Sequence, residues 1–87
     1  LQINSDKATR VIVIRMRSVP AIDASAMKSL RELADRAKKK KITLIFSHVN
    51  EQPMSVMTKD GFTEYVGAEN FHANIVEALD YAENLAK

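Results

Sequence analysis

Two short polar stretches, residues 17–25 and 47–53, hold the side chains of this sequence that are best suited to chemistry. They include Asp23, Ser25, His48, Asn50 and Glu51. A serine brought next to a histidine would suggest a hydrolase, with Ser25 as nucleophile and His48 as general base. Ser25 lacks the flanking glycines of a nucleophile elbow, and 87 residues leave little depth for a pocket that excludes water. We therefore expect no enzyme, and interpret His48 as a loop residue that satisfies a neighbouring backbone group.

The composition argues against several other kinds of site. The sequence has no cysteine and only two histidines, His48 and His72, which are far apart, so no metal site is expected. Its two glycines, Gly61 and Gly67, cannot build a glycine-rich phosphate loop, and no cofactor is expected. The small net charge of +2 and the few aromatic residues argue against a nucleic-acid partner. The longest apolar run, Val11–Ile14, is far shorter than the roughly 20 residues that cross a bilayer.

Apolar patterns predict the elements that position the two polar stretches. Residues 11–14 and 42–46 are apolar runs without alternation, typical of strands that are covered on both faces in a parallel sheet. Between them, apolar residues recur at the three- and four-residue steps of a helix with one buried stripe. These residues are Ala26, Met27, Leu30, Leu33, Ala34 and Ala37. The order predicts a βαβ unit with a right-handed crossover.

Capping residues predict where the first helix begins and ends. Pro20 cannot lie inside a helix, whereas Asp23 and Ser25 are good N-cap residues, so the helix should begin near Asp23 or Ala24. The lysines at 38–41 mark its end, where positive charge complements the helix dipole.

The second half of the sequence predicts two more helices and a short strand. A helix from Glu51 to Asp60 should have Asn50 as its cap, Gly61 as its left-handed stop, and two methionines facing the core. Residues 62–66 are predicted to form a short strand. Asn74 and Glu77 have capping-box spacing before a last helix. Its predicted buried stripe comprises Ile75, Ala78, Leu79, Ala82 and Leu85. Residues 1–87 thus form a single α/β domain with a small β-sheet.

Both polar stretches follow predicted strands, and ligands of open α/β sheets bind beyond the carboxyl ends of strands. We therefore predict that the two stretches share one sheet edge. Residues 19–27, called the Asp23 turn below, lead into a helix start, where free backbone N–H groups attract anions. If Asp23 acted only as an N-cap, it would contribute about 1 kcal/mol to the stability of the helix. The predicted partner or ligand site comprises Asp23, Ala24, Ser25, Ala26 and Met27 of the turn, with His48 and Asn50 of the adjacent loop.

The Asp23 turn resembles the signature of the STAS family, named for sulfate transporters and anti-sigma-factor antagonists. In that family the helix opens with an Asp-Ser-Ser/Thr-Gly-like motif, and here the motif stands as Asp23-Ala24-Ser25-Ala26. The stretches 14–23 and 48–53 look like the transporter branch. So do Gly61-Phe62, Gly67 and Asn74 before Glu77-Ala78-Leu79. The resemblance covers residues 11–85 and implies the STAS fold, a parallel βαβ core packed by helices.

Two departures from the family pattern carry information. Where the antagonists have the serine that accepts a regulatory phosphate, this sequence has Ala24, so that switch cannot operate there. Ser25 matches the next hydroxyl position of the family, and its phosphorylation is a hypothesis. The family also has strands and a helix before the strand equivalent to residues 11–14, where only residues 1–10 stand here. We therefore expect the domain to be N-terminally incomplete in this sequence.

The resemblance implies a non-catalytic regulatory and protein-interaction domain of a SulP-type sulfate or anion transporter. Such a domain would be the C-terminal soluble part of an integral membrane protein, at the cytoplasmic face of the cell membrane. Implied partners are the transmembrane domain, another STAS copy, an acyl carrier protein or a nucleotide. An acidic partner such as a carrier protein would suit the basic residues Arg15, Arg17, Lys28 and Arg31 and the lysines at 38–41, although these charges equally serve solubility. The alternative is a free-standing anti-sigma-factor antagonist that binds a kinase-like partner through the same turn, against which Ala24 weighs.

Overall fold

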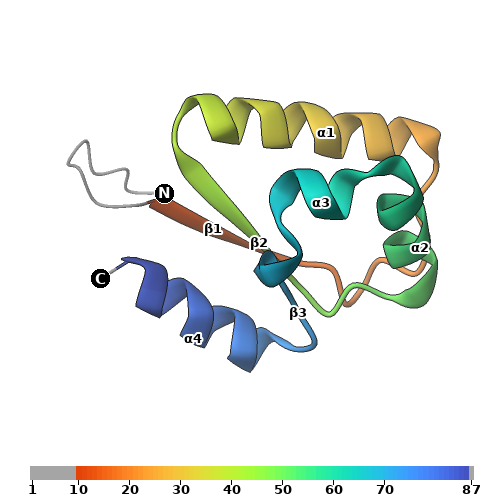
Figure 1. Cartoon of the computed structure of the whole chain (residues 1–87). Helices are drawn as coiled ribbons and strands as arrows, with labels where there is room; N and C mark the ends of the chain where they lie inside the picture. The colour runs from red at the N-terminus through yellow and green to blue at the C-terminus, as the bar shows by residue number, and fades with distance from the viewer. Residues whose placement is uncertain (1–9, 87) are drawn as a thin grey trace.

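A parallel strand pair with its connecting helix forms the centre of the fold (Figure 1). The computed structural model describes residues 10–86. Strand β1 (Arg10–Arg15) leads through the Asp23 turn into helix α1 (Ala24–Lys39), which returns the chain to strand β2 (Ile42–Ser47). The predicted βαβ unit is therefore confirmed. The expected upstream strands would precede residue 10 and lie outside the described residues.

The sheet has three parallel strands in the order β1-β2-β3 within the described residues. Strand β3 (Phe71–His72) adds to the other side of β2, with Phe46 opposite Phe71. Because β2 has a neighbour on each side and helices above and below, its last four residues are buried, whereas β1 is only half-buried. The non-alternating apolar run of β2 is the sequence signature of this central position.

Three further helices complete the domain: α2 (Glu51–Asp60), α3 (Phe62–Val66) and α4 (Ile75–Ala86), with a 3₁₀ turn, η1 (Ala68–Asn70), after α3. The predicted strand at residues 62–66 is wrong, because these residues are helix α3. Gly61 has φ +83°, ends α2 in the left-handed conformation and turns the chain directly into α3. Phe62 is then buried under the hairpin of the two helices. The short strand lies later, at β3.

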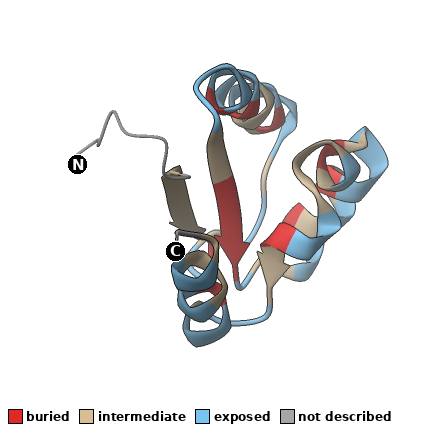
Figure 2. Cartoon of the chain, turned by 60° about the vertical axis from the view of Figure 1, so that its left-hand side comes forward, coloured by how far each residue is buried: buried red, intermediate tan, exposed pale blue. Residues whose placement is uncertain are grey.

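Helices cover both faces of the sheet (Figures 1 and 2). Helix α1 packs over β2 on one face, and α4 lies on the opposite face against β1 and β2. The α2–α3 hairpin flanks α1, to which the Arg31–Asp60 ion pair joins it. No helix within residues 10–86 has both the length and the apolar character needed to cross a membrane.

The core lies between α1, β2 and the α2–α3 hairpin. Phe46 is central to it, stacked on Phe71 at 4.9 Å between ring centroids and edge-on to Phe62 at 5.7 Å. Both geometries are favourable for aromatic pairs. Met57 is fully buried beside them, as predicted, while Met54 is half-buried.

Each predicted stripe contains one leucine that the structure leaves exposed. Leu33 of α1 is 36% exposed and Leu79 of α4 is 53% exposed. On α4 the inward face is centred on Ala78, and Leu79 is rotated about 100° away from it around the helix axis. The small side chain of Ala78 lets the helix approach the sheet closely, which leaves Leu79 beyond the contact.

The predicted helix ends are largely confirmed. The Asp23 carboxylate accepts a hydrogen bond from the backbone N–H of Ala26 at 2.8 Å, so Asp23 is the N-cap of α1. Before α4, Asn74 Oδ1 accepts from the N–H of Glu77 at 2.9 Å. Basic residues occupy the last turn of α1, as the dipole favours.

Candidate functional site

The two polar stretches leave the same edge of the sheet. Arg15 and Ser47 are register partners at the ends of β1 and β2, and the Met16 N–H donates to the Ser47 carbonyl at 3.0 Å. Because both strands run in the same direction, both following loops must start side by side. The prediction that residues 17–25 and 47–53 share an edge is therefore confirmed.

Asn50 joins the two loops. Its Nδ2 group donates to the carbonyl oxygens of Val19 at 2.8 Å and Arg17 at 3.1 Å, with a longer contact of 3.5 Å to that of Met16. An amide NH₂ has two donors, so the two shorter bonds account for its capacity. Asn50 is the N-cap residue of α2, as predicted, but its side chain makes no capping hydrogen bond. The amide is instead used across the loops, where it satisfies carbonyls that no strand neighbour can reach.

Gln52 makes a second connection that the sequence analysis missed. Its Oε1 accepts from the Ile22 N–H at 2.8 Å, and its Nε2 donates to the Ile22 carbonyl at 3.1 Å. The side-chain amide thus pairs with both backbone groups of one residue, as a neighbouring strand would. The sequence feature that could have indicated this connection is the pair Asn50 and Gln52 just before Pro53. Pro53 is buried in the first turn of α2, where the missing backbone N–H of a proline is tolerated.

These bonds hold the backbone of the Asp23 turn and leave its tip at the surface. Asp23, Ala24 and Ser25 are exposed, and Ala26 is half-buried. Met27, which the sequence placed in the same site, contributes to the hydrophobic core. The accessible part of the predicted site is therefore the first turn of α1. The Asp23 carboxylate is engaged there by the helix N-terminus, while the Ser25 side chain lies on the exposed surface.

A shallow hollow lies beside this tip, between α1 and α2. Ala24, Met27 and Lys28 line one side, and Val56 and Asp60 the other. It is small, open and partly apolar, which suits a protruding side chain of a partner better than a reaction that must exclude water.

His48 lies at a different part of the same edge. Its backbone adopts the left-handed conformation, with φ +51°, and its N–H donates to the His72 carbonyl at 2.9 Å, which extends the pairing of β2 with β3. The link to a neighbouring backbone group that we predicted is thus made by the main chain of His48. Its side chain is exposed and borders a second hollow, which Val49 and Met54 also line. His72 borders the same hollow, and its ring is tilted by 44° against that of Tyr81, with 4.7 Å between the ring centroids.

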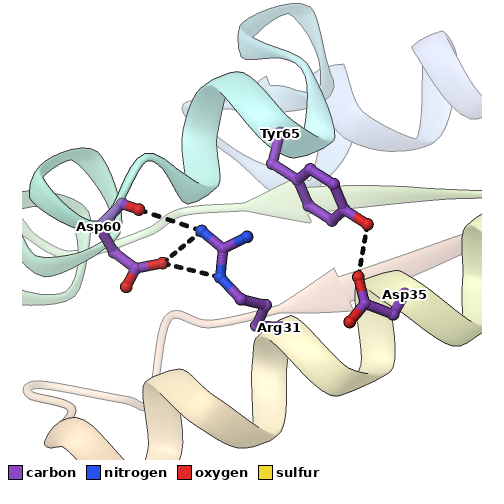
Figure 3. A network of polar contacts seen from close by, with 4 residues as sticks. All are labelled: Arg31, Asp35, Asp60 and Tyr65. Carbon is purple, nitrogen blue, oxygen red and sulfur yellow. Dashed lines mark hydrogen bonds and ion pairs between the residues drawn. The ribbon is translucent and has the colours of Figure 1, made fainter.

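An ion-pair and hydrogen-bond network ties α1 to the α2–α3 hairpin (Figure 3). The Arg31 guanidinium donates to the Asp60 carboxylate at 2.6 and 3.1 Å and to the Asp60 carbonyl at 3.0 Å, at the end of α2. The Tyr65 hydroxyl donates to the Asp35 carboxylate. The Arg31 guanidinium carbon and Lys38 Nζ lie 5.1 and 4.4 Å from the Tyr65 ring centroid.

The network shifts the pKa of two of its members. The hydrogen bond from Tyr65 to the Asp35 carboxylate raises the pKa of the Tyr65 phenol, because the carboxylate would repel a phenolate. The hydrogen bond to Asp60 raises the pKa of Arg31, which stays charged at any physiological pH. Both side chains of the Arg31–Asp60 pair are over a third exposed, so solvent screens their attraction and the net stabilisation of the domain by this pair is small.

Within residues 10–86, no group of three or more His, Asp or Glu side chains is arranged to hold a metal ion.

Comparison with known proteins identifies the family. The sequence model described as "STAS domain" matches residues 2–78. The chain belongs to the STAS domain family. Among solved structures, this STAS domain is similar to a sulfate transporter family protein from Wolinella succinogenes. The TM-score is 0.83 at 36% sequence identity, over 87% of this chain and 62% of that one.

Two sequence relatives are Arabidopsis thaliana proteins. The STAS domain is 28% identical over 68 residues to "Probable sulfate transporter 4.2" and 31% identical over 68 residues to "Sulfate transporter 4.1, chloroplastic". Each alignment covers 78% of this chain and 10% of the relative. The chain thus spans about a tenth of the length of these relatives. The resemblance to the STAS family and the α/β fold with a small parallel sheet are both confirmed.

Proposed function

We propose that this STAS domain is a non-catalytic regulatory and protein-interaction domain of a SulP-type sulfate or anion transporter. It lies on the cytoplasmic face of the membrane and acts through the Asp23 turn. The observation that carries the proposal is the double connection of this turn to the neighbouring loop by Asn50 and Gln52, which presents Asp23, Ala24 and Ser25 at the surface.

A fixed and exposed turn suits docking. A surface whose backbone is already held loses little conformational entropy when a partner binds, so more of the contact energy appears as affinity. Asn50 and Gln52 hold residues 19–22 in this way. The kinship with sulfate transporters supports a partner in a transport protein.

The partners we propose are the transmembrane domain of the same transporter and, as further candidates, another STAS copy, an acyl carrier protein or a nucleotide. Phosphorylation of Ser25 is a further hypothesis about the Asp23 turn. Ser25 is exposed in the first helical turn, where a phosphate would gain from the helix dipole but oppose the Asp23 carboxylate. Detection of phosphorylated Ser25 in cells would support it, and consistently unmodified Ser25 peptides would count against it.

The test is a substitution at the tip of the turn in the intact transporter. Ala24→Arg places a bulky charge at the exposed tip and should change the rate of anion uptake severalfold if the tip docks. The matched control is Ser29→Arg, an exposed position further along the same helix. Equal uptake by the two variants, both present in the membrane at wild-type amounts, would refute docking through the Asp23 turn.

The sequence of the full-length natural protein provides a second test of the transporter assignment. A transporter must encode several apolar segments of roughly 20 residues each. If the natural protein encodes none, the transporter assignment fails and a free-standing antagonist becomes the better explanation.

A further inference from the structure

Charge is strongly separated along the chain and in space. Residues 60–86 contain six Asp or Glu and no Lys or Arg, whereas α1 and the turn after it carry most of the lysines. Three of these acidic residues, Glu77, Asp80 and Glu83, lie on α4, and the other three lie on the α2–α3 hairpin and η1, beside α1. Because α1 and α4 cover opposite faces of the sheet, the acidic residues of α4 lie on the face away from the lysines of α1 (Figure 1). The Arg31–Asp60 ion pair of Figure 3 neutralises part of the positive charge of α1.

The outward face of α4 combines this acidic charge with exposed apolar side chains. Val76 is 72% exposed and Leu79 is 53% exposed, and they are neighbours one helical turn apart. Asp80 and Glu83 follow them at four-residue steps and are also exposed. Figure 2 shows the exposed side of this helix turned away from the sheet. We call Val76, Leu79, Asp80 and Glu83 the α4 patch.

Within residues 10–86, the packing of the domain does not require the α4 patch. Its apolar side chains face away from the core, whose contact with α4 is made around Ala78. Glu83 lies in the last turn of α4, which holds no basic residue, and an acidic charge there opposes the helix dipole. The patch therefore costs the isolated domain some stability, as expected of a surface that is used by a partner.

We propose that the α4 patch docks onto the Lys- and Arg-rich cytosolic loops of the transporter's own membrane part, with Val76 and Leu79 at the centre of the contact. The inference rests on the proposed function. Cytoplasmic loops of membrane proteins carry an excess of Lys and Arg, so the acidic residues of the patch meet complementary charge. This contact is separate from the Asp23 turn, which lies on α1.

Two other occupants fit the patch less well. The cytoplasmic leaflet of a membrane is negative and repels an acidic face, so a lipid surface is disfavoured. A second copy could offer its basic α1. However, α1 and α4 lie on opposite faces of the domain, so a contact between α4 of one copy and α1 of the next would be head-to-tail. Such a contact adds further copies to an open chain, except where the rotation between copies closes a ring.

Photo-crosslinking in membranes that contain the intact transporter tests the proposal. p-Benzoylphenylalanine is placed at Val76, and the product is mapped by mass spectrometry. The expected product joins position 76 to a cytosolic loop rich in Lys or Arg. The same probe at Leu33, an apolar residue on the basic helix α1 with 36% exposure, should give severalfold less of this product. A product with a second copy, with another protein, or with lipid only would overturn the proposal, as would no product.

Charge variants add a control for folding. Asp80→Lys with Glu83→Lys should lower the loop crosslink about tenfold, because like charges would then face each other. The neutral pair Asp80→Asn with Glu83→Gln should lower it by a smaller factor. Glu64→Lys with Glu69→Lys makes the same change of charge on exposed residues of α3 and η1, and should leave the yield unchanged. Equal yields in all variants would refute the electrostatic contact.

The outcomes of these experiments distinguish a failure of this inference from a failure of the proposed function. If Ala24→Arg alters uptake while position 76 crosslinks elsewhere, the transporter assignment stands and the α4 contact is wrong. If the natural protein has no membrane part, both fail.

Discussion

At the scale of single residues, the side-chain amides of Asn50 and Gln52 make the hydrogen bonds to backbone groups that a neighbouring strand or a helix cap would otherwise make. Asn50 and Gln52 follow β2 and bind the backbone of the segment that follows β1. A carboxamide carries its donor and its acceptor on two separate atoms, so Gln52 pairs with both backbone groups of Ile22, whereas an ionised carboxylate has no donor. The turn is thereby ordered without burying its tip.

The first prediction concerns Asn50. Asn50→Asp keeps the shape of the side chain but replaces the NH₂ donor with an oxygen that faces the Val19 and Arg17 carbonyls. We expect a loss of about 1–3 kcal/mol in the free energy of unfolding, from the unpaired carbonyls and the new repulsion. Urea denaturation measures it. The control Asn84→Asp, at an exposed position of α4, should change stability by no more than about 0.5 kcal/mol. Equal stability of the two variants would show that the Asn50 bonds are dispensable.

The second prediction concerns the pH dependence of Tyr65. Its hydrogen bond to Asp35 raises the pKa of the phenol, so the protonated phenol is the form that the folded state favours. The stabilisation is therefore fully present below the ordinary tyrosine pKa of about 10 and is lost as the pH rises through the raised value. Subtracting the ultraviolet phenolate titration of Tyr65→Phe from that of the wild type isolates Tyr65. A midpoint above the ordinary value is expected, and one at or below it would contradict the contact.

At the scale of elements, the segment from α2 to β3 shows that burial of a side chain in the core can override the local propensity to form a strand. Residues 62–66 include Phe62, Thr63, Tyr65 and Val66, which favour strands, yet they form α3. The left-handed Gly61 reverses the chain so that Phe62 enters the core beside Phe46. Burial of one aromatic ring, which recovers roughly 1.5–3 kcal/mol, exceeds the strand propensity of a few residues.

The third prediction tests this reversal. Gly61→Ala should destabilise the domain by about 1–2 kcal/mol through backbone strain alone, because φ is +83° and an added Cβ meets no atom within 4 Å. Gly67→Ala should cost more, since its φ of +111° and ψ of +118° lie outside the left-handed helical region and the Cβ would lie 3.0 Å from Nδ2 of buried Asn70. Thermal unfolding of both variants gives the comparison. Gly61→Asn should recover part of the loss, because asparagine tolerates the left-handed region. No loss in Gly61→Ala would mean that the reversal does not depend on glycine.

At the scale of the whole molecule, the two proposed docking surfaces lie apart from each other. The Asp23 turn lies at the carboxyl edge of the sheet on the α1 side, and the α4 patch lies on the opposite face. Two separate docking surfaces of modest strength can hold a domain against a larger partner through effective concentration. Transport variants at Ala24 and crosslinks at Val76 therefore probe independent contacts of one assembly.

The sequence by itself determined the βαβ centre, the caps and the family. Uninterrupted apolar runs and a helical stripe are local signals, and Asp23 caps a helix through atoms three residues away. The motif at 23–26 and the later stretches were enough to indicate the STAS family, and Ala24 is a fact of the sequence.

Only the tertiary structure decided the contacts between distant residues. Asn50 and Gln52 reach carbonyls and amides some thirty residues away, and no periodicity records such a distance. The exposed positions of Leu33 and Leu79 depend on how closely each helix approaches the sheet, which neighbouring side chains set together. The Asp23 turn was thus visible as a motif, but its fixed backbone and its exposed tip arise from packing across the sheet edge.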